Sequence, residues 1–349
     1  MAKLNVLIAG STGYIGVQLI KLLVKHDNIK IKYLCGKTSV GKKISIYEKS
    51  LKFKKLPKIV KFNKIYLKDV DIIFTALPNG EAQDISNHLL KKNTLIDLAA
   101  DFRLNKASEY LKWYNQKHRS INNIKKSLYA LPEITGKKVK NFNIISCPGC
   151  YPTSILLPLI PLIKKGLIKT HNIIIDSKSG YSGAGRGVHL KYKYKNLYES
   201  LSAYGVGFHR HNSEIEQEIK KYTKNKFSFT FTPHLIPMFR GILSTIYIDL
   251  SKGSNITKLE RTLNKTYSKS IFVKILKTNT LISTNNVINT NNCYISICKT
   301  KHKNRFVILS AIDNLIKGGA GQAIQNMNIR YNFSISKGLK WKSYFFLFF

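Results

Sequence analysis

The chain has 349 residues, 44% of them apolar, and its 58 Lys and Arg outweigh 18 Asp and Glu to give a net charge of +40. The apolar content is sufficient for a core and excludes wholesale disorder, and the length favours two domains. No run approaches the about 18 apolar residues of a membrane-spanning helix, no secretory signal is present, and the cysteines, five in all, are too few for a disulfide framework. We therefore expect a cytoplasmic protein with no membrane partner.

The excess of basic residues raises the question of nucleic-acid binding, because Lys and Arg neutralise phosphates. Only 8 of the 58 basic residues are Arg, the better reader of phosphates and bases, and the lysines are scattered along the whole chain. Charge of this kind affects solubility and non-specific contacts. We expect no nucleic-acid partner.

The first 148 residues alternate between strand and helix patterns. Short apolar runs predict buried strands, and segments with one apolar face predict the helices between them. This alternation is typical of a parallel sheet with right-handed crossovers, an α/β domain. In chain order the expected strands are 4–9, 29–35, 71–76, 94–98 and 143–146, and the expected helices include 18–25 and 81–90.

From about residue 173 the strands follow one another with few helices between them. This pattern predicts a second domain of α+β type with a mainly antiparallel sheet. The apolar residues 344–349 are too few to span a bilayer and are expected to pack on the protein or on a partner. The expected strands are 173–179, 227–232, 244–250, 294–298 and 306–311, followed by a helix at 321–329.

A glycine-rich loop joins the first strand to the first helix, with the sequence Gly10-Ser11-Thr12-Gly13-Tyr14-Ile15-Gly16. Its spacing and its strand–turn–helix context are those of a dinucleotide-binding turn. Gly10 would allow the tight turn, Gly13 the approach of a pyrophosphate to the helix N-terminus, and Gly16 close packing of helix on strand. An ordinary strand–helix corner is the alternative.

The second expected strand ends at Cys35-Gly36-Lys37 and carries no acidic residue there. NAD-binding domains usually place an acidic side chain at this point to hold the ribose hydroxyls. Lys37 suits a 2′-phosphate instead. The sequence therefore favours NADP over NAD.

The segment Cys147-Pro148-Gly149-Cys150 follows the last strand of the first domain, and a helix is expected to begin near Thr153 or Ser154. A cysteine at a helix N-terminus has its thiolate stabilised, which makes Cys150 a candidate nucleophile. The Cys-x-x-Cys spacing also matches a redox dithiol, but about 145 residues precede it, whereas thioredoxin-like modules carry theirs near the start. A buried apolar role is the default for the other cysteines, Cys35, Cys293 and Cys298.

A polar cluster at residues 207–219 contains His209, Arg210 and His211. Asn212 or Ser213 is expected to cap a helix there, and a histidine just before a helix can exchange protons near pH 7. A metal site would lack a fourth ligand at usable spacing, so no metal is expected. Two other turns each carry an arginine suited to clamping an anion, namely Ser179–Arg186 and Pro237–Gly241 with Arg240.

These motifs together resemble the N-acetyl-gamma-glutamyl-phosphate reductase family, whose nucleophile motif Asn-Pro-Gly-Cys-Tyr-Pro-Thr appears here with Cys147 in place of the Asn. The similarity runs in the family's order over about residues 10–328. It is carried by the stretches 10–14, 77–80, 97–104, 131–133, 147–153, 179–186, 209–215, 237–241 and 313–328.

The resemblance implies an NADP-binding Rossmann domain at 1–148, a catalytic and oligomerising α+β domain at 149–311, and a segment at 312–349 that returns to the first domain. It implies a homo-oligomer, dimer or tetramer, with Cys150 as nucleophile and His211 as acid/base, His209 competing for that role. The implied cofactor residues are Gly10, Ser11, Thr12, Gly13, Tyr14, Ile15, Gly36, Lys37, Pro78, Ser182, Gly183, Asn314 and Gly318, and the implied substrate residues are Arg103, Ser179, Arg186, His209, Arg210 and Arg240.

The activity implied is NADPH-dependent reduction of N-acetyl-glutamyl 5-phosphate to the 5-semialdehyde through a thioester on Cys150, in arginine biosynthesis. Aspartate-semialdehyde dehydrogenase, which has similar domains and chemistry, is the near alternative. A non-catalytic binding protein on the same fold is the distant one, because Cys147 departs from the family motif.

Overall fold

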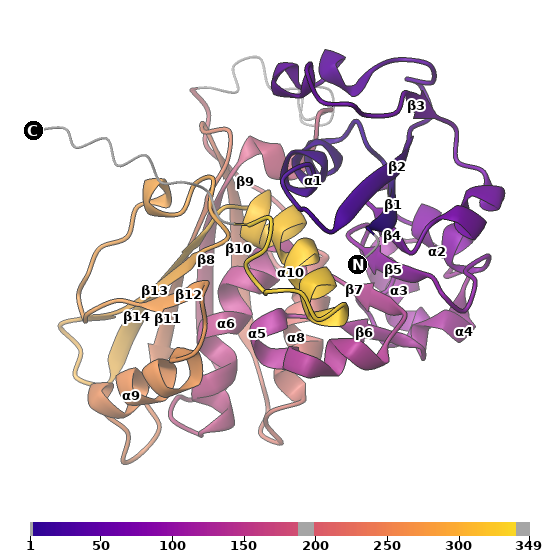
Figure 1. Ribbon diagram of the computed structural model, residues 1–349. Helices are drawn as coiled ribbons and strands as arrows, with labels where there is room; N and C mark the ends of the chain where they lie inside the picture. Colours follow the sequence, from indigo (N-terminus) through magenta and orange to yellow (C-terminus); the bar gives the residue numbers. More distant parts are fainter. Residues whose placement is uncertain (1–2, 188–198, 340–349) are drawn as a thin grey trace, which may run out of the picture.

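The computed structural model describes residues 3–187 and 199–339, which form two seven-stranded sheets (Figure 1). Helices α6, α8 and α10 lie between the two sheets (Figure 1). The apolar segment 344–349, expected to pack on the protein or a partner, lies outside the described residues.

The first sheet is parallel throughout, in the order β3-β2-β1-β4-β5-β7-β6. Its central strands are buried on both faces, which explains their continuous apolar runs. The strands are β1 Leu4–Ala9, β2 Ile29–Cys35, β3 Ile59–Val60, β4 Ile72–Thr75, β5 Thr94–Asp97, β6 Ser127–Tyr129 and β7 Ile144–Ser146, and the helices are α1 Tyr14–Leu23, α2 Glu81–Ser86, α3 Ala107–Tyr114, α4 Ile121–Ile124 and α5 Pro132–Thr135.

The second sheet is mainly antiparallel, in the order β12-β13-β14-β11-β8-β10-β9, with parallel pairs only at β8–β10 and β12–β13 among the strands described. One face packs on helices α6 Cys150–Lys164, α8 His211–Lys220 and α9 Ile256–Tyr267. The strands are β8 Ile173–Gly180, β9 Ser202–Ala203, β10 Phe229–Ile236, β11 Ile242–Asp249, β12 Val273–Ile275, β13 Cys293–Lys299 and β14 Arg305–Ile312.

After β14 the chain returns to the first sheet. A short π-helix, η7 Ile316–Ala320, leads into α10 Gly321–Arg330. Ala323, Ile324 and Met327 are buried in the same apolar cluster as Val6 and Ile8 of β1. Residues 316–327 thus belong to the core of the first sheet.

Two helix starts differ from the sequence expectation. Helix α6 begins at Cys150 itself rather than near Thr153, because Pro152 falls in the first turn, where no helical N–H is needed. Helix α8 begins at His211 with Arg210 as the residue before it, and neither Asn212 nor Ser213 caps it. The Ser213 hydroxyl instead donates to the carbonyl of Arg210 at 2.6 Å.

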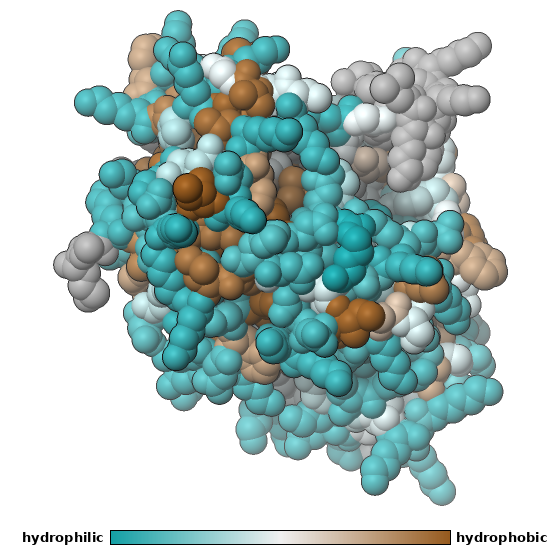
Figure 2. Space-filling model, turned by 90° about the vertical axis from the view of Figure 1, so that its right-hand side faces the viewer, coloured by the Kyte–Doolittle hydropathy of each residue, from teal (hydrophilic) through white to brown (hydrophobic). Residues whose placement is uncertain are grey.

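The face shown in Figure 2 is mostly hydrophilic, and its apolar side chains gather in small separate patches. This surface fits a chain with 58 basic residues spread along its length. Within residues 3–187 and 199–339, no helix has both the length and the apolar character needed to cross a membrane.

Candidate active site

Cys150 lies at the first turn of α6, directly after the carboxyl end of β7. In a parallel sheet, ligands bind beyond this end of the strands. The thiol is half-buried, and Gly318 of η7 presses against it: a Cβ on Gly318 would lie 2.7 Å from the Cβ of Cys150. Cys150, the nucleophile predicted from the sequence, therefore lies where the two halves of the molecule meet.

Two adjoining hollows open on either side of Cys150. The first, about 200 Å³ in volume, is bounded by the glycine loop, the turns after β4 and β5, and η7; it is lined by Ile15, Leu77, Asn79, Leu98, Ala99, Ala100, Arg103, Pro148, Gly149, Ser182, Gly183, Arg210, His211, Asn314, Leu315, Gly318 and Gly319. The second is more aromatic, with Trp113, Tyr151, Tyr204 and Phe208 beside Ser179, His209 and Arg210. Cys150 and His211 line both.

The wholly buried carboxyl group of Glu214 organises the first turn of α6. It accepts from the backbone N–H of Gly149 at 2.9 Å, the Tyr129 hydroxyl at 3.1 Å and the Arg103 guanidinium at 2.9 Å. Arg103 also donates to the carbonyl of Cys147 at 2.8 Å. Both residues that flank Pro148 are therefore held by one buried ion pair.

His211 lies against the backbone of Gly149, where a Cβ would come within 2.4 Å of its Nε2. Burial lowers the pKa of His211 well below its usual value, and the positive charges of Arg103 and Arg210 act in the same direction. Its Nε2 is 3.7 Å from Glu214. The imidazole is therefore neutral at neutral pH and able to accept a proton.

The surroundings of Cys150 favour the protonated thiol at neutral pH. Burial raises its pKa to about 11, an increase that the positive charge of Arg103 opposes. The sequence led us to expect a stabilised thiolate at this helix start; the surrounding apolar atoms outweigh that effect. A proton acceptor is consequently needed, and His211 is the neutral base that shares both hollows with the thiol.

The turn after β5 forms the opposite wall of the first hollow. Asp97 accepts from the N–H groups of Ala99 at 2.8 Å and Phe102 at 3.2 Å, and Ala100 is held in the left-handed region with φ 75°. Such a conformation is uncommon for a residue with a Cβ and persists where the surroundings enforce it. The main chain of this turn is thus fixed facing Cys150.

Arg210 is the exposed cation of the site. No Asp or Glu pairs with it in the part of the chain that the structure describes, and its guanidinium lies over the Tyr114 ring at 5.7 Å. With the Asn79 amide oriented to donate to Ala99, the Asn79 oxygen accepts from Arg210 at 3.0 Å. This places one uncompensated positive charge at the rim of both hollows.

The glycine loop fits a dinucleotide. Gly10 has φ 82° and its Cβ would lie 2.2 Å from the carbonyl oxygen of Ala76, while a Cβ on Gly16 would lie 2.2 Å from the Gly10 carbonyl. Gly13 precedes α1 with no side chain capping the helix. The first N–H groups of α1 thus have no capping side chain, and they lie at the positive end of the helix, which suits a pyrophosphate. Ser11 is wholly buried, and its hydroxyl donates to the Cys35 carbonyl at 3.0 Å.

The sequence matches two protein-family models. Residues 5–142 match "Semialdehyde dehydrogenase, NAD binding domain", and residues 150–314 match "Semialdehyde dehydrogenase, dimerisation domain". An N-acetyl-gamma-glutamyl-phosphate reductase of Thermoanaerobacter pseudethanolicus is 43% identical over 327 residues, 93% of this chain and 94% of its own. A probable chloroplastic one of Arabidopsis thaliana is 38% identical, covering 95% and 83%. The chain belongs to the N-acetyl-gamma-glutamyl-phosphate reductase family.

Solved structures with the same fold are more distant in sequence. Aspartate semialdehyde dehydrogenase II of Vibrio cholerae matches with a TM-score of 0.69 at 15% identity, over 95% of this chain and 99% of its own. Aspartate semialdehyde dehydrogenase with NADP from Candida albicans matches with a TM-score of 0.65 at 17% identity, over 94% and 98%. These likenesses support the two-domain fold of the reductase family.

The structure separates the predicted arginines. Arg103 and Arg210 lie beside Cys150, whereas Arg186 donates to the carbonyl of Thr12 at 2.8 Å and covers the Tyr14 ring. Arg240 pairs with the buried Asp313 at 3.2 Å. The latter two arginines line a third hollow with Tyr14, and Cys150 does not line it.

The other predicted residues fall into two groups. Ser182, Gly183, Asn314 and Gly318 line the first hollow, with the Asn314 amide donating to the Ser182 hydroxyl at 2.9 Å; Ser179 and His209 line the second. Farther out, the exposed Lys37 pairs with Glu81 at 2.6 Å. Pro78 itself lines neither hollow, while its neighbours Leu77 and Asn79 line the first.

Glu214 and Asn79 were not among the residues predicted for the site. Glu214 follows His211 by three positions in the first turn of α8, a spacing that puts both on one side of a helix. That spacing was the available signal in the reductase sequence. Its meaning depends on burial, which the composition of the helix does not reveal.

Cys147 is wholly buried, unlike Cys150. It packs in the apolar cluster of the first sheet, and burial raises its pKa to about 12. Its nearest polar neighbour is the Asn326 amide, 3.8 Å from the sulfur. The Cys-x-x-Cys segment therefore holds two thiols in different surroundings, an arrangement that gives no support to a redox dithiol.

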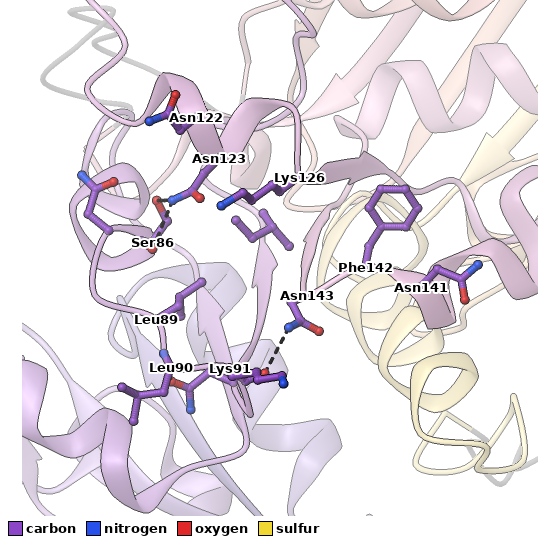
Figure 3. Close-up of a pocket in the computed structure, with 13 residues that line it drawn as sticks. Ser86, Leu89, Leu90, Lys91, Asn122, Asn123, Lys126, Asn141, Phe142 and Asn143 are labelled. Atoms are coloured by element: carbon purple, nitrogen blue, oxygen red, sulfur yellow. Dashed lines mark hydrogen bonds between the residues drawn. The ribbon is translucent and has the colours of Figure 1, made fainter.

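A further open hollow of about 730 Å³ lies away from Cys150, around α4 and the ends of α2 and β7 (Figure 3). Its asparagines are used within the fold: Asn123 donates to Ser86, and Asn143 donates to the carbonyl of Lys91 (Figure 3). Neither Cys150 nor His211 lines this hollow.

Proposed function

We propose that the protein reduces N-acetyl-glutamyl 5-phosphate to N-acetyl-glutamate 5-semialdehyde and phosphate with NADPH, as a step of arginine biosynthesis. One observation carries the proposal: Cys150 lines both a hollow that reaches Ile15 of the glycine loop and an adjoining hollow with an aromatic wall, and the uncompensated Arg210 lies at the rim of both. The first suits a nicotinamide, and the second suits an anionic acyl group.

Cys150 is the proposed nucleophile. Its sulfur attacks the carbonyl carbon of the acyl phosphate; a C–S bond forms, the C–O bond to phosphate breaks, and phosphate leaves with that electron pair. A thioester remains on Cys150. Covalent catalysis of this kind divides one difficult reduction into two easier steps.

His211 is the proposed acid/base. Because its pKa is lowered well below the usual value, it is neutral and accepts the thiol proton as the sulfur attacks. NADPH, when bound at the glycine loop, supplies a hydride to the thioester carbon. The resulting hemithioacetal collapses to the aldehyde and the Cys150 thiolate, to which His211 returns the proton.

Arg210 is the proposed substrate clamp. Arg103 is occupied by Glu214 and by the Cys147 carbonyl, so it holds the site together rather than the substrate. Arg210 stands at the rim with its charge free for a carboxylate or phosphate. The aromatic wall of Trp113, Tyr204 and Phe208 would contact the remainder of the acyl group.

The deciding assay follows phosphate-dependent reduction of NADP⁺ by N-acetyl-glutamate semialdehyde, with aspartate semialdehyde as the competing substrate. We expect turnover with the former, and Cys150→Ser should lower kcat by at least about 10³-fold while the Kd for NADPH changes less than about twofold. Preference for aspartate semialdehyde would assign the alternative activity. No turnover with either substrate would leave a binding protein.

We further propose that the chain works in the cytoplasm as a homo-oligomer, dimer or tetramer, without nucleic acid, and divides at 1–148, 149–311 and 312–349. The face of the second sheet opposite α6 supports the assembly: Ile174 of β8 and Tyr247 of β11 are paired neighbours on it and are 44% and 37% exposed. Sedimentation of Tyr247→Lys tests this surface, since a buried lysine would weaken the contact.

A further inference from the structure

Lys317 is a fully buried lysine that the proposed chemistry does not use. It is 0% exposed, its ammonium is 2.6 Å from Glu133 Oε1 and 2.9 Å from Gln325 Oε1, and it lies over the Phe272 ring at 5.7 Å. Taking an ammonium out of water is costly even when it is paired. A fully buried lysine is therefore a candidate for a functional role.

The ion pair joins parts of the chain that are far apart in sequence. Glu133 comes from α5 beside the first sheet, Gln325 from α10, and Phe272 from the entry to β12 of the second sheet. Gln325 donates to Glu133 at 2.9 Å and accepts from Asn291 at 3.0 Å. The contacts around Lys317 therefore tie both halves of the molecule to η7.

Helix η7 is where the two halves meet at the site. Its backbone bonds span five residues, with Gly318 donating to Asp313 and Ala320 donating to Leu315, each at 2.9 Å. π-turns of this kind are uncommon and occur often at functional sites. A Cβ on Gly318 would lie 2.7 Å from the Cβ of Cys150, and a Cβ on Gly319 would lie 2.7 Å from the side chain of Ile15, at the start of α1.

We propose that Lys317 is a positioning residue: its ion pair with Glu133 fixes the π-turn so that Gly318 rests on Cys150 while Gly319 rests on Ile15. The π-turn then sets the spacing between the thiol and a nicotinamide bound beside α1. The inference rests on the proposed function for its catalytic consequence. It adds that acylation and hydride transfer depend differently on Lys317.

Acyl transfer needs Cys150, His211 and Arg210. Although Gly318 touches Cys150, these three residues are positioned by the first turns of α6 and α8 and by the bond from Gly149 to Glu214. Hydride transfer also needs the nicotinamide at the correct distance from the thioester, and misplacement by about 1 Å can cost about 100-fold in rate. Lys317→Met replaces the charge with a side chain of similar volume. It should therefore slow hydride transfer and spare acylation.

The test measures the two half-reactions separately in Lys317→Met. We expect the burst of phosphate from the acyl phosphate to fall less than about threefold, single-turnover hydride transfer to fall at least about tenfold, and the primary deuterium isotope effect on kcat to rise. Arg305→Met is the control, since it removes an exposed ion pair with Asp249, at 2.9 Å, at the start of β14. It should change none of these quantities.

A second readout needs no turnover. NADP⁺ should protect wild-type Cys150 from iodoacetamide, and this protection should be lost in Lys317→Met although the Kd for NADP⁺ changes less than about threefold. If wild type releases no phosphate burst, the proposed function fails, and protection alone then tests the inference. Parallel losses in both half-reactions, or a lower Tm with unchanged kinetics and protection, would show a merely structural lysine.

Lys317→Met leaves the Glu133 carboxyl buried without its cation and could fail to fold. The double variant Lys317→Met/Glu133→Gln removes both charges and retains the volume. The same separation of half-reactions and loss of protection is expected in this variant. Wild-type hydride transfer with wild-type protection in a folded double variant would overturn the proposal.

Discussion

Different kinds of residue make the close contacts on the two sides of Cys150. On the nucleotide side the close contacts are made by glycines: Gly10 against Ala76, Gly16 against Gly10, and Gly318 against the thiol residue itself. Around the segment before α6 they are made by the charged and polar side chains of Arg103, Glu214 and His211, although Arg103 and His211 also line the nucleotide-side hollow. The glycine contacts require residues without a Cβ, whereas the contacts before α6 require paired charges.

This difference determines how each side can fail. A methyl group added at Gly10, Gly16 or Gly318 must displace backbone, because the nearest atoms there are backbone or Cβ. On the other side a side chain of equal volume can fill the space and still remove the function, because the charge or proton site is lost. The predictions below use these two kinds of failure, from the largest expected effect to the smallest.

The thiol between the two sides should react as a protonated cysteine in the free protein. Because burial raises the pKa of Cys150 to about 11 and His211 is neutral, the thiolate fraction grows with pH up to that value. Alkylation by iodoacetamide should therefore accelerate about tenfold per pH unit, or about 10³-fold from pH 7.5 to 10.5. Cys150→Ser supplies the background from other cysteines, and circular dichroism checks folding at each pH. A rate that levels off near pH 7 would mean that a thiolate–imidazolium pair already exists.

Adding a methyl group on the nucleotide side should show how little room it has. Gly318→Ala forces a Cβ to 2.7 Å from the Cβ of Cys150, and we expect kcat to fall about 100-fold. Gly319→Ala is the matched neighbour, since its Cβ would meet the far end of the Ile15 side chain, which can rotate away. Its kcat should fall less than about fivefold. Equal losses in the two variants would place the sensitivity in the π-turn itself and not in the contact with Cys150.

The same contrast explains what could be predicted from sequence. The glycine loop, the strand that precedes it and the nucleophile turn are local patterns, because a tight turn or close approach requires Gly at a fixed spacing. The alternation of strands and helices likewise follows from local periodicity, so both sheets were expected, with five of the seven strands of each. The strands that were missed, β3, β6, β9 and β12, have only two or three residues, too few to show a periodic pattern.

The charged side could be predicted only in part. Arg186 and Arg240 looked equivalent to Arg210 in sequence, since each is an arginine near a turn, yet they pair with Thr12 and Asp313. Glu214 was missed because its role comes from burial against Gly149, 65 positions away. Pairings of this kind depend on how distant elements pack, which no local pattern contains.

The two arginines that the fold separates should respond differently to truncation. Arg210→Ala should raise KM for the acyl substrate about tenfold at unchanged Tm, because it removes an exposed charge at the rim of the site. Arg240→Ala should instead lower the free energy of unfolding by about 3 kcal/mol, because it leaves Asp313 buried without its cation. Steady-state kinetics and urea unfolding on both variants check this. A change in KM alone for Arg240→Ala would return that residue to the substrate.

Lys37 should make a small contribution to cofactor choice. It is 73% exposed and paired with Glu81 in the free protein, and exposed ion pairs contribute at most about 1 kcal/mol. We expect Lys37→Ala to lower kcat/KM for NADPH about fivefold and to leave the value for NADH unchanged. Glu81→Gln, which frees the ammonium, should shift the preference slightly toward NADPH. Equal losses with both cofactors would show that Lys37 does not contact the 2′-phosphate.

The smallest effect is expected at Cys147, where the family motif has Asn. The buried Asn326 donates to the carbonyl of Ala130 at 2.9 Å, but its own oxygen has no hydrogen-bond partner among the described residues. The Asn326 NH2 group faces position 147, where it meets only the sulfur at 3.8 Å. An Asn there could accept from it, so Cys147→Asn should raise the free energy of unfolding by about 1 kcal/mol. Activity should stay within about twofold, because Arg103 bonds the main-chain carbonyl of this residue and not its side chain. Cys147→Ala, which removes the sulfur without adding an acceptor, should be less stable than either. A several-fold rise in kcat for Cys147→Asn would mean that the side chain at position 147 contributes to the reaction, and that the polar surroundings important for catalysis include this residue.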